Sequence, residues 1–372
     1  MQYTRLKKWA LLRLRKRTGL PAIFDKSANL LKSSFFRAFV LLFAVGLGLS
    51  WLIPQPARSQ QAKDVELTLV SFAVTKSAYD RIIPGFTAKW KREHNQNVRF
   101  NQSYGGSGSQ TRAVIDGLEA DVVHLALGFD VTRIQQAGLI QPGWEREVPN
   151  GGIVSKSVVA LVTRPGNPKR IQNWSDLAKS GIKVITANPK TSGVARWNFL
   201  ALWGSVTQNG GNEQAARNFV GQVYRNVPIL PKDAREASDV FYKQNQGDVL
   251  LNYENEILLA KQQGETEPFI IPQVNISIDN PVAVVDKNAD KHGTRQVAQA
   301  FVQYLFSPEA QREFAKVGFR PVNTTVAAEY SRNFPRIGKL FTISQLGGWD
   351  GAQRRFFADG ALFDQLQVAS RN

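Results

Sequence analysis

Two short segments rich in serine and glycine carry the residues best suited to chemistry. Residues 188–198 read Asn-Pro-Lys-Thr-Ser-Gly-Val-Ala-Arg-Trp-Asn, between an apolar run at 182–186 that predicts a short buried strand and an apolar stretch at 197–204 that predicts a helix. Ser192 occupies the N-cap position, and Gly193 allows a tight turn. A helix start of this kind leaves backbone N–H groups unpaired, and these groups together with the helix dipole can hold an anion.

The same pattern recurs at two other places. Residues 104–110, Tyr-Gly-Gly-Ser-Gly-Ser-Gln, follow the strand-like 97–104 and precede a helical pattern at 111–118. Residues 231–234, Pro-Lys-Asp-Ala, follow 227–230, which we interpret as a strand, and open a helix that runs to Gln244. One capped helix is ordinary, because most N-caps bind nothing. Several anion-ready starts in one chain favour an oxyanion held between them.

Metal, redox and disulfide chemistry find little support in the composition. The 372 residues include no cysteine, which excludes disulfides, thiolate metal sites and a lipid-modified N-terminal cysteine. The three histidines, His94, His124 and His292, are scattered without ligand spacing. We therefore expect no metal and no cofactor.

Hydrolysis remains a remote alternative. Residues 105–109, Gly-Gly-Ser-Gly-Ser, nearly match a nucleophile elbow, but Ser109 stands where the final glycine belongs, and the loop lacks the lysine of a phosphate-binding NTPase loop. Glu254 and Glu256 are two residues apart, so on a helix they face different ways. A secreted hydrolase would need a histidine close to its nucleophile. We expect that the protein is not an enzyme.

The net charge of +17 is concentrated at the N-terminus. Residues 1–59 hold eleven Lys or Arg and one acid, Asp25, which leaves 36 basic and 29 acidic residues, or +7, for the rest of the chain. Beyond residue 59 no run of basic residues is interleaved with aromatics, so we expect no nucleic-acid partner.

The N-terminal segment resembles a secretory signal peptide. A basic region is followed by the apolar core 38–53, and Pro54 and Pro56 end any helix. Small residues at 57–59, Ala-Arg-Ser, offer cleavage before Gln60, with Ala62 as an alternative end point. We predict a signal peptide at 1–59 and a periplasmic mature protein. The competing interpretation is a tether through an uncleaved segment, for which the core is short.

After residue 60 the patterns of strand and helix alternate, which predicts α/β architecture with mainly parallel sheets. Proline residues interrupt β-type runs at two places, residues 163–168 and residues 272–285. We place crossings between two lobes at these points. Lobe one is predicted to hold residues 60–164 and 269–372, and lobe two residues 165–268.

Together these segments resemble the periplasmic sulfate-binding proteins of ABC importers, over essentially the whole chain from Val65 onward. The matching segments are 102–108 (Gln-Ser-Tyr-Gly-Gly-Ser-Gly), 115–121 (Ile-Asp-Gly-Leu-Glu-Ala-Asp), 188–193 with 195–198, 247–250 (Gly-Asp-Val-Leu), 254–256 (Glu-Asn-Glu), 340–343 (Leu-Phe-Thr-Ile) and 357–360 (Phe-Ala-Asp-Gly). The resemblance implies a type II periplasmic-binding-protein fold, with two lobes of mixed, mainly parallel sheet, helices on both faces and a hinge, closing on a dehydrated sulfate.

The resemblance also implies the ligand contacts. Ser107 would give a hydroxyl from lobe one, and lobe two would give backbone N–H groups from the loop at 192–194, that is Ser192, Gly193 and Val194, and from Ala234. Gly106 and Arg196 would lie behind the site, with Arg196 locking it through hydrogen bonds without pairing with the anion. The implied partners are sulfate or thiosulfate and the permease of an ABC importer, and we expect a monomer.

Two departures from the family pattern matter, and a third is minor. Tyr253 stands where the family has a tryptophan whose indole N–H reaches the ligand; a tyrosine hydroxyl can donate as well, and it can also accept. Ala73 stands where the family has an aspartate after the first strand. Val194 replaces the second glycine of a pair, which is harmless if only its N–H is used.

Sulfate chemistry fits such a site on its own terms. Sulfate at neutral pH is a dianion without a proton, so neutral donors and helix dipoles can satisfy it. Hydrogen phosphate carries a proton that would find no acceptor among donors, and an unpaired buried group costs about 1–3 kcal/mol. We therefore predict a sulfate binder, possibly for thiosulfate, with another tetrahedral oxyanion such as phosphate or molybdate as the alternative.

Overall fold

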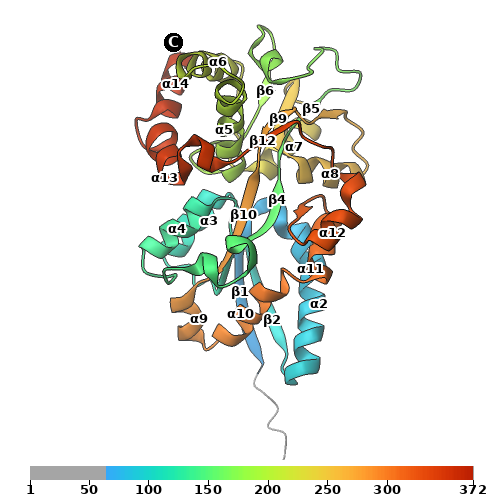
Figure 1. Cartoon of the computed structure of the whole chain (residues 1–372), viewed down its shortest axis with the longest axis vertical. Helices are drawn as coiled ribbons and strands as arrows, with labels where there is room; N and C mark the ends of the chain where they lie inside the picture. The colour runs from blue at the N-terminus through green and yellow to red at the C-terminus, as the bar shows by residue number, and fades with distance from the viewer. Residues whose placement is uncertain (1–63, 372) are drawn as a thin grey trace, which may run out of the picture. The chain divides into compact units, whose positions relative to one another are not determined.

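The computed structural model describes residues 64–371, so the predicted signal peptide at 1–59 lies outside the described residues. Two main β-sheets organise this part of the chain (Figure 1). The larger has six strands in the order β11-β4-β10-β3-β1-β2. Its strands are β1 (Val65–Phe72), β2 (Val98–Gly105), β3 (Val122–His124), β4 (Ile153–Ser157), β10 (Ile278–Val284) and β11 (Arg320–Pro321).

The second sheet has four strands in the order β6-β7-β5-β8. They are β5 (Val159–Thr163), β6 (Val184–Ile185), β7 (Val249–Tyr253) and β8 (Phe269–Ile270). A separate parallel pair joins β9 (Val274–Ile276) to β12 (Lys339–Phe341). Central strands β5 and β7 are buried along their whole length, as continuous runs such as Val-Ala-Leu-Val predict.

The strand directions correct one prediction, that of mainly parallel sheets. Among the described pairings four are parallel and five antiparallel. The chain leaves the six-stranded sheet through β4 and returns to it through β10, and these neighbours run in opposite directions. Strands that follow one another through a helix, such as β1 and β2, are parallel.

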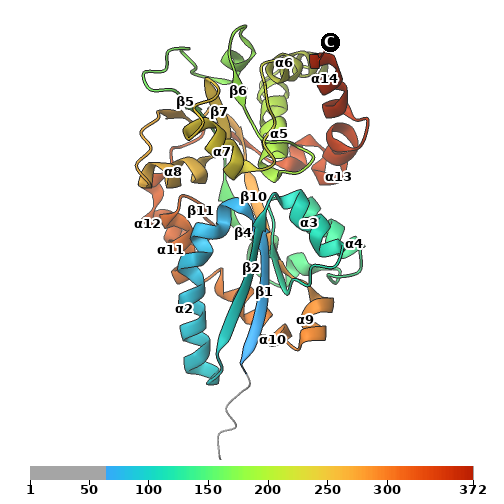
Figure 2. The same cartoon turned by 180° about the vertical axis from the view of Figure 1, so that it is seen from behind.

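Helices cover both faces of each sheet, as expected for this fold. In Figures 1 and 2, α2 lies on one side of the six-stranded sheet and α3 and α4 on the other, while α5, α6 and α14 gather beside the four-stranded sheet. The helices are α2 (Lys76–His94), α3 (Ser107–Ile115), α4 (Gly128–Gln136), α5 (Gly193–Thr207), α6 (Glu213–Arg225), α7 (Ala234–Tyr242), α8 (Glu254–Gln262), α9 (Asp286–His292), α10 (Arg295–Tyr304), α11 (Pro308–Lys316), α12 (Thr324–Glu329), α13 (Gly348–Ala352) and α14 (Leu362–Arg371).

Sheet membership differs from the predicted lobe boundaries in two places. Strand β5 pairs with β7 and β8, so the chain passes from one sheet to the other at Val158, before the boundary at 164. The C-terminal segment was assigned to lobe one, but Leu366 of α14 approaches Gly221 of α6, and Lys190 binds Asp364 at 2.9 Å. The end of the chain therefore packs with the four-stranded sheet. The division into hinged lobes itself stays a prediction.

The prediction of a strand at 227–230 is wrong. These residues have no regular structure, although Asn226 and Pro231 on either side accept hydrogen bonds from Val184 and Asn188 at 2.8 Å. The prolines at 228 and 231 have no N–H to donate, so a continuous ladder cannot form.

Candidate anion-binding site

A small cavity lies where loops from the two sheets meet. All six residues predicted to contact a ligand line it, and Gly106, which was expected behind the site, lines it as well. No lysine or arginine is among the lining residues. They are Phe72, Ala73, Val74, Gly105, Gly106, Ser107, Ala126, Ser192, Gly193, Val194, Asp233, Ala234 and Tyr253.

The cavity is surrounded by helix starts. Ser107 is the first residue of α3, Gly193 and Val194 open α5, and Ala234 opens α7. The first N–H groups of a helix have no partner within it, and in the described part of the chain these four make no hydrogen bond outside it. Several helix dipoles and free N–H groups therefore converge on one small space.

One more helix start lines the cavity, and the sequence analysis did not place it at the site. The short 3₁₀ helix η2 (Ala73–Thr75) follows β1 directly and leads into α2, and Ala73 and Val74 line the cavity. The sequence itself shows a strand pattern at 65–74 that passes straight into a helical pattern at 75–94. No glycine or serine marks the junction as an anion-binding helix start.

The two serines offer different groups from those expected. The Ser107 hydroxyl donates to Oδ2 of Asp130 at 2.6 Å and accepts from the Ala126 N–H at 3.0 Å, which leaves its backbone N–H free. The Ser192 N–H is bound to the carbonyl of Asn188 at 2.8 Å, whereas its hydroxyl has no partner among the described residues and does not cap α5. The geometry therefore presents the N–H of Ser107 and the hydroxyl of Ser192.

Tyr253 contributes a buried hydroxyl without a partner. Its side chain is 2% exposed, and its Oη makes no hydrogen bond in the part of the chain that the structure describes. Burial raises the pKa of Tyr253 well above its usual value, and the nearby carboxyls of Asp130 and Glu256 add to this. The hydroxyl therefore keeps its proton. A buried polar group that lacks a partner is rare, and here it lines the cavity.

Asp130 and Arg196 lie behind this lining, and sequence reasoning missed the first of them. Asp130 is fully buried in the first turn of α4; burial raises its carboxyl pKa, while the Arg196 cation and the bond from Ser107 oppose the rise. Arg196 donates Nε–H to the carbonyl of Pro189 at 2.9 Å and does not line the cavity. The pair thus fixes Ser107 and the 188–193 loop from outside.

Two glycines let the loops from the two sheets approach closely. A Cβ at Gly193 would lie 2.3 Å from the Ala126 Cβ, and a Cβ at Gly106 would lie 2.5 Å from the carbonyl oxygen of Thr191. Neither distance is possible for real atoms, so both positions require glycine while the loops are in contact. Gly106 has a φ of −60°, which shows that space, and not backbone conformation, selects glycine there.

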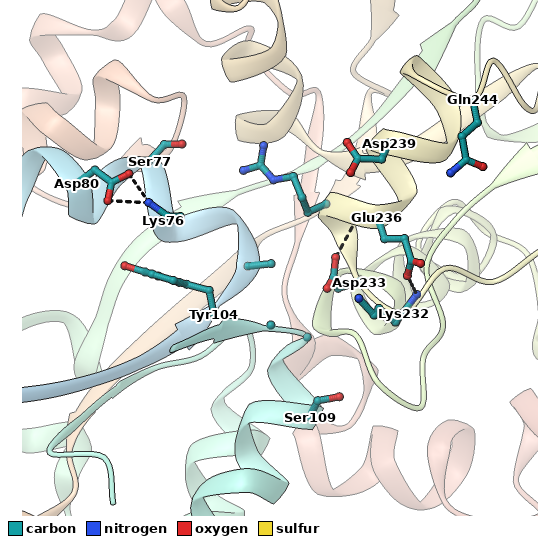
Figure 3. Close-up of a pocket in the computed structure, with 14 residues that line it drawn as sticks. Lys76, Ser77, Asp80, Tyr104, Ser109, Lys232, Asp233, Glu236, Asp239 and Gln244 are labelled. Carbon is teal, nitrogen blue, oxygen red and sulfur yellow. Dashed lines mark hydrogen bonds and ion pairs between the residues drawn. The ribbon is translucent and has the colours of Figure 1, made fainter. Parts of the chain in front are cut away.

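A larger pocket opens beside the cavity and shares Ala73, Gly105, Gly106 and Asp233 with it. Figure 3 shows its charged lining, in which α2 contributes Lys76 bound to Asp80, and α7 begins at Asp233, whose carboxylate accepts from the Glu236 N–H at 2.9 Å. The mixed signs of these side chains leave no strongly positive surface around the cavity.

The histidines do not approach the serines. His124 is fully buried with Nδ1 2.7 Å from the Tyr79 hydroxyl, and His292 lies between Asp121 and Glu119. Among the described residues no histidine bonds to Ser107, and no group of three or more His, Asp or Glu side chains is placed to hold a metal ion. No helix in residues 64–371 is long and apolar enough to span a bilayer.

Small cavities of this kind, between two α/β sheets joined by crossing strands, are typical of proteins that bind solutes. Residues 67–320 match the bacterial extracellular solute-binding protein family, and the chain belongs to that family. The expected type II periplasmic-binding-protein fold is confirmed by its structural relatives.

Within that class the relatives carry a narrower name. A sulfate-binding protein of Synechocystis is 59% identical over 84% of this chain and 90% of its own. The structure of the sulfate-binding protein SubI of Mycobacterium tuberculosis aligns with a TM-score of 0.73 and 38% identity, covering 79% of this chain and all of that one. A thiosulfate-binding protein of Pseudomonas aeruginosa is 37% identical over 80% of this chain and 90% of its own.

Proposed function

We propose that this protein captures sulfate and delivers it to an ABC importer. One observation carries the proposal: the cavity is lined by free N–H groups from several helix starts and by two hydroxyls, with no cationic side chain. Such a lining suits an anion that has no proton, because each of its oxygens can only accept. The names of the relatives agree with this ligand.

The donor set we propose is a revision of the one expected from the sequence. Ser107, Gly193, Val194 and Ala234 give backbone N–H groups, and Ser192 and Tyr253 give hydroxyls. The first four open helices, so their N–H groups carry the positive end of the helix dipole. Arg196 acts from behind, through the loop at 188–193.

We expect selectivity against phosphate because hydrogen phosphate carries a proton and sulfate does not. The proton of hydrogen phosphate needs an acceptor, and the free groups of this lining are mostly donors. Three lining groups could serve as acceptors: the free hydroxyls of Tyr253 and Ser192, and the Asp233 carboxylate, one oxygen of which already accepts from Glu236. Phosphate, thiosulfate and molybdate are therefore the alternatives to test.

The remaining steps of uptake belong to partners. The signal peptide would direct export and be cleaved near residue 60. The mature chain would act as a monomer in the periplasm and pass its ligand to a membrane permease driven by an ATPase. We propose a binding role without catalysis. The serine of the elbow-like segment, Ser107, donates a hydrogen bond to Asp130, and no histidine bonds to it among the described residues.

Calorimetry of the chain without residues 1–59 tests this proposal. Sulfate, thiosulfate, phosphate and molybdate are titrated separately at neutral pH. We expect tight binding of sulfate and weak or no binding of phosphate. Tight phosphate binding without sulfate binding would overturn the sulfate assignment and favour another tetrahedral oxyanion. Turnover of an ester would revive the hydrolase alternative.

A further inference from the structure

One buried hydrogen bond joins the two sheets directly. The indole N–H of Trp197, a side chain with no exposed surface, donates to the carbonyl of Ala126 at 2.9 Å. Trp197 lies on α5, and Ala126 follows β3 of the six-stranded sheet. Neither the proposed donor set nor the cavity lining includes Trp197.

Each partner is tied to its own sheet. The residue after Trp197, Asn198, donates to the carbonyl of Leu251 on β7 at 3.1 Å and to Thr186 at 2.9 Å, which fixes α5 to the four-stranded sheet. The Ala126 carbonyl also accepts from Asn280 of β10 at 3.2 Å, which fixes it to the six-stranded sheet. The Trp197–Ala126 bond can therefore form only while the two sheets are in contact.

The surroundings extend the same contact. Trp349 packs edge-on against Trp197 with ring centroids 4.7 Å apart, and it lies against Gly128, the residue that opens α4. Ala126 also donates its N–H to Ser107, so the backbone of one residue touches both the cavity lining and the tryptophan. The distance between the loops and the integrity of this bond are thus coupled.

We propose that Trp197 is a positioning residue that holds the protein closed around its anion without touching the anion. The inference rests on the proposed function, since it concerns the closed, ligand-holding state. If the sheets separate, Ala126 keeps its bond from Asn280, and the freed indole N–H meets water, so opening leaves no buried group unpaired. The bond consequently slows release without preventing it.

The test is a Trp197→Phe substitution, which keeps an aromatic side chain and removes the donor. Dissociation is followed by chasing radiolabelled sulfate with excess unlabelled sulfate, and the dissociation constant comes from calorimetry. Because a net hydrogen bond of ordinary strength is lost, we expect dissociation about two- to tenfold faster and the association rate unchanged.

Trp203→Phe is the matched control. Trp203 lies on the same helix and is 3% exposed, but its ring contacts Phe356 and Arg355 at the far end. We expect Trp203→Phe to leave the dissociation rate unchanged. If Trp197→Phe also dissociates at the wild-type rate, and both variants only melt at lower temperature, the proposal is overturned. A wild-type protein that binds no sulfate would instead overturn the proposed function, and with it the proposed role of Trp197.

Discussion

At the scale of single residues, the cavity is defined by polar groups that the protein leaves unpaired. Tyr253 is the clearest case, because a buried hydroxyl without a partner costs free energy in the empty protein. Ser192 adds a second free hydroxyl, while Ser107 has committed its own to Asp130. Unpaired donors of this kind are stabilising only once an acceptor arrives, so we propose that the ligand binds beside them.

Tyr253→Phe should weaken sulfate binding about ten- to a hundredfold, because hydrogen bonds to charged groups contribute about 1.5–3 kcal/mol. Tyr253→Trp should restore much of the affinity if the pocket has room, since the indole N–H is again a donor. Calorimetry gives both values. Tyr224→Phe is the control, because Tyr224 is equally buried with an unpartnered hydroxyl but lies on α6, away from the cavity. Equal affinities for the Tyr253→Phe variant and wild type would show that Tyr253 only packs.

At the scale of elements, the site depends on helix starts brought close together. The N-terminal ends of α3 and α5 meet through Gly106 and Gly193, where a methyl group would collide with the opposing loop. Because Thr191 presents a backbone oxygen to Gly106, the loop cannot give way by turning a side chain.

Gly106→Ala should therefore fold normally but fail to close. We expect at least a tenfold loss of sulfate affinity, with the melting temperature of the ligand-free protein nearly unchanged because the clash exists only when the loops touch. Gly351→Ala is the control, since a Cβ there meets no atom within 4 Å. Calorimetry and thermal melts decide, and an affinity equal to that of the control variant would count against the proposed closure of the two loops on the ligand.

The elements were also where sequence reasoning was strongest and weakest. Glycine and serine after an apolar run located the starts of α3 and α5, although neither helix has a side-chain cap. Asp233 located α7, because its side chain caps the adjacent first turn. Asp130 was not found, since its contact with Ser107 depends on how α4 packs beside α3. Which group each serine presents was likewise decided by contacts outside its own segment, with Asp130 for one and Asn188 for the other.

At the scale of the whole molecule, stability depends on keeping a buried histidine neutral. His124 lies in the core with its Nδ1 against Tyr79 and its Nε2 unpartnered, and burial lowers its pKa to about 3. In the unfolded chain its pKa is about 6.5. The folded state therefore binds the proton more weakly, so this contribution to stability is present above about pH 6.5 and is lost as the pH falls toward 3.

Urea unfolding between pH 6 and pH 4 should accordingly show a falling free energy of unfolding, with His124 supplying up to about 1.4 kcal/mol per pH unit. His124→Gln should reduce that slope, whatever it does to stability at pH 7. The His292 pKa is raised by its carboxylate partners, so His292 is largely protonated in both states below pH 6 and serves as the control position. An unchanged slope in the His124→Gln variant would refute the assignment.

The interleaved sheets also set an order of events in time. His124 pairs with Val282, Ser157 with Ile278, and Lys156 with Arg320, so the six-stranded sheet needs strands from both ends of the chain. During synthesis the first half leaves the ribosome long before its partners exist, and until then β3 and β4 have exposed edges. The chain therefore completes its fold only after nearly all of it has been made. A polypeptide whose fold is completed this late can still pass, unfolded, through a narrow membrane channel during most of its synthesis.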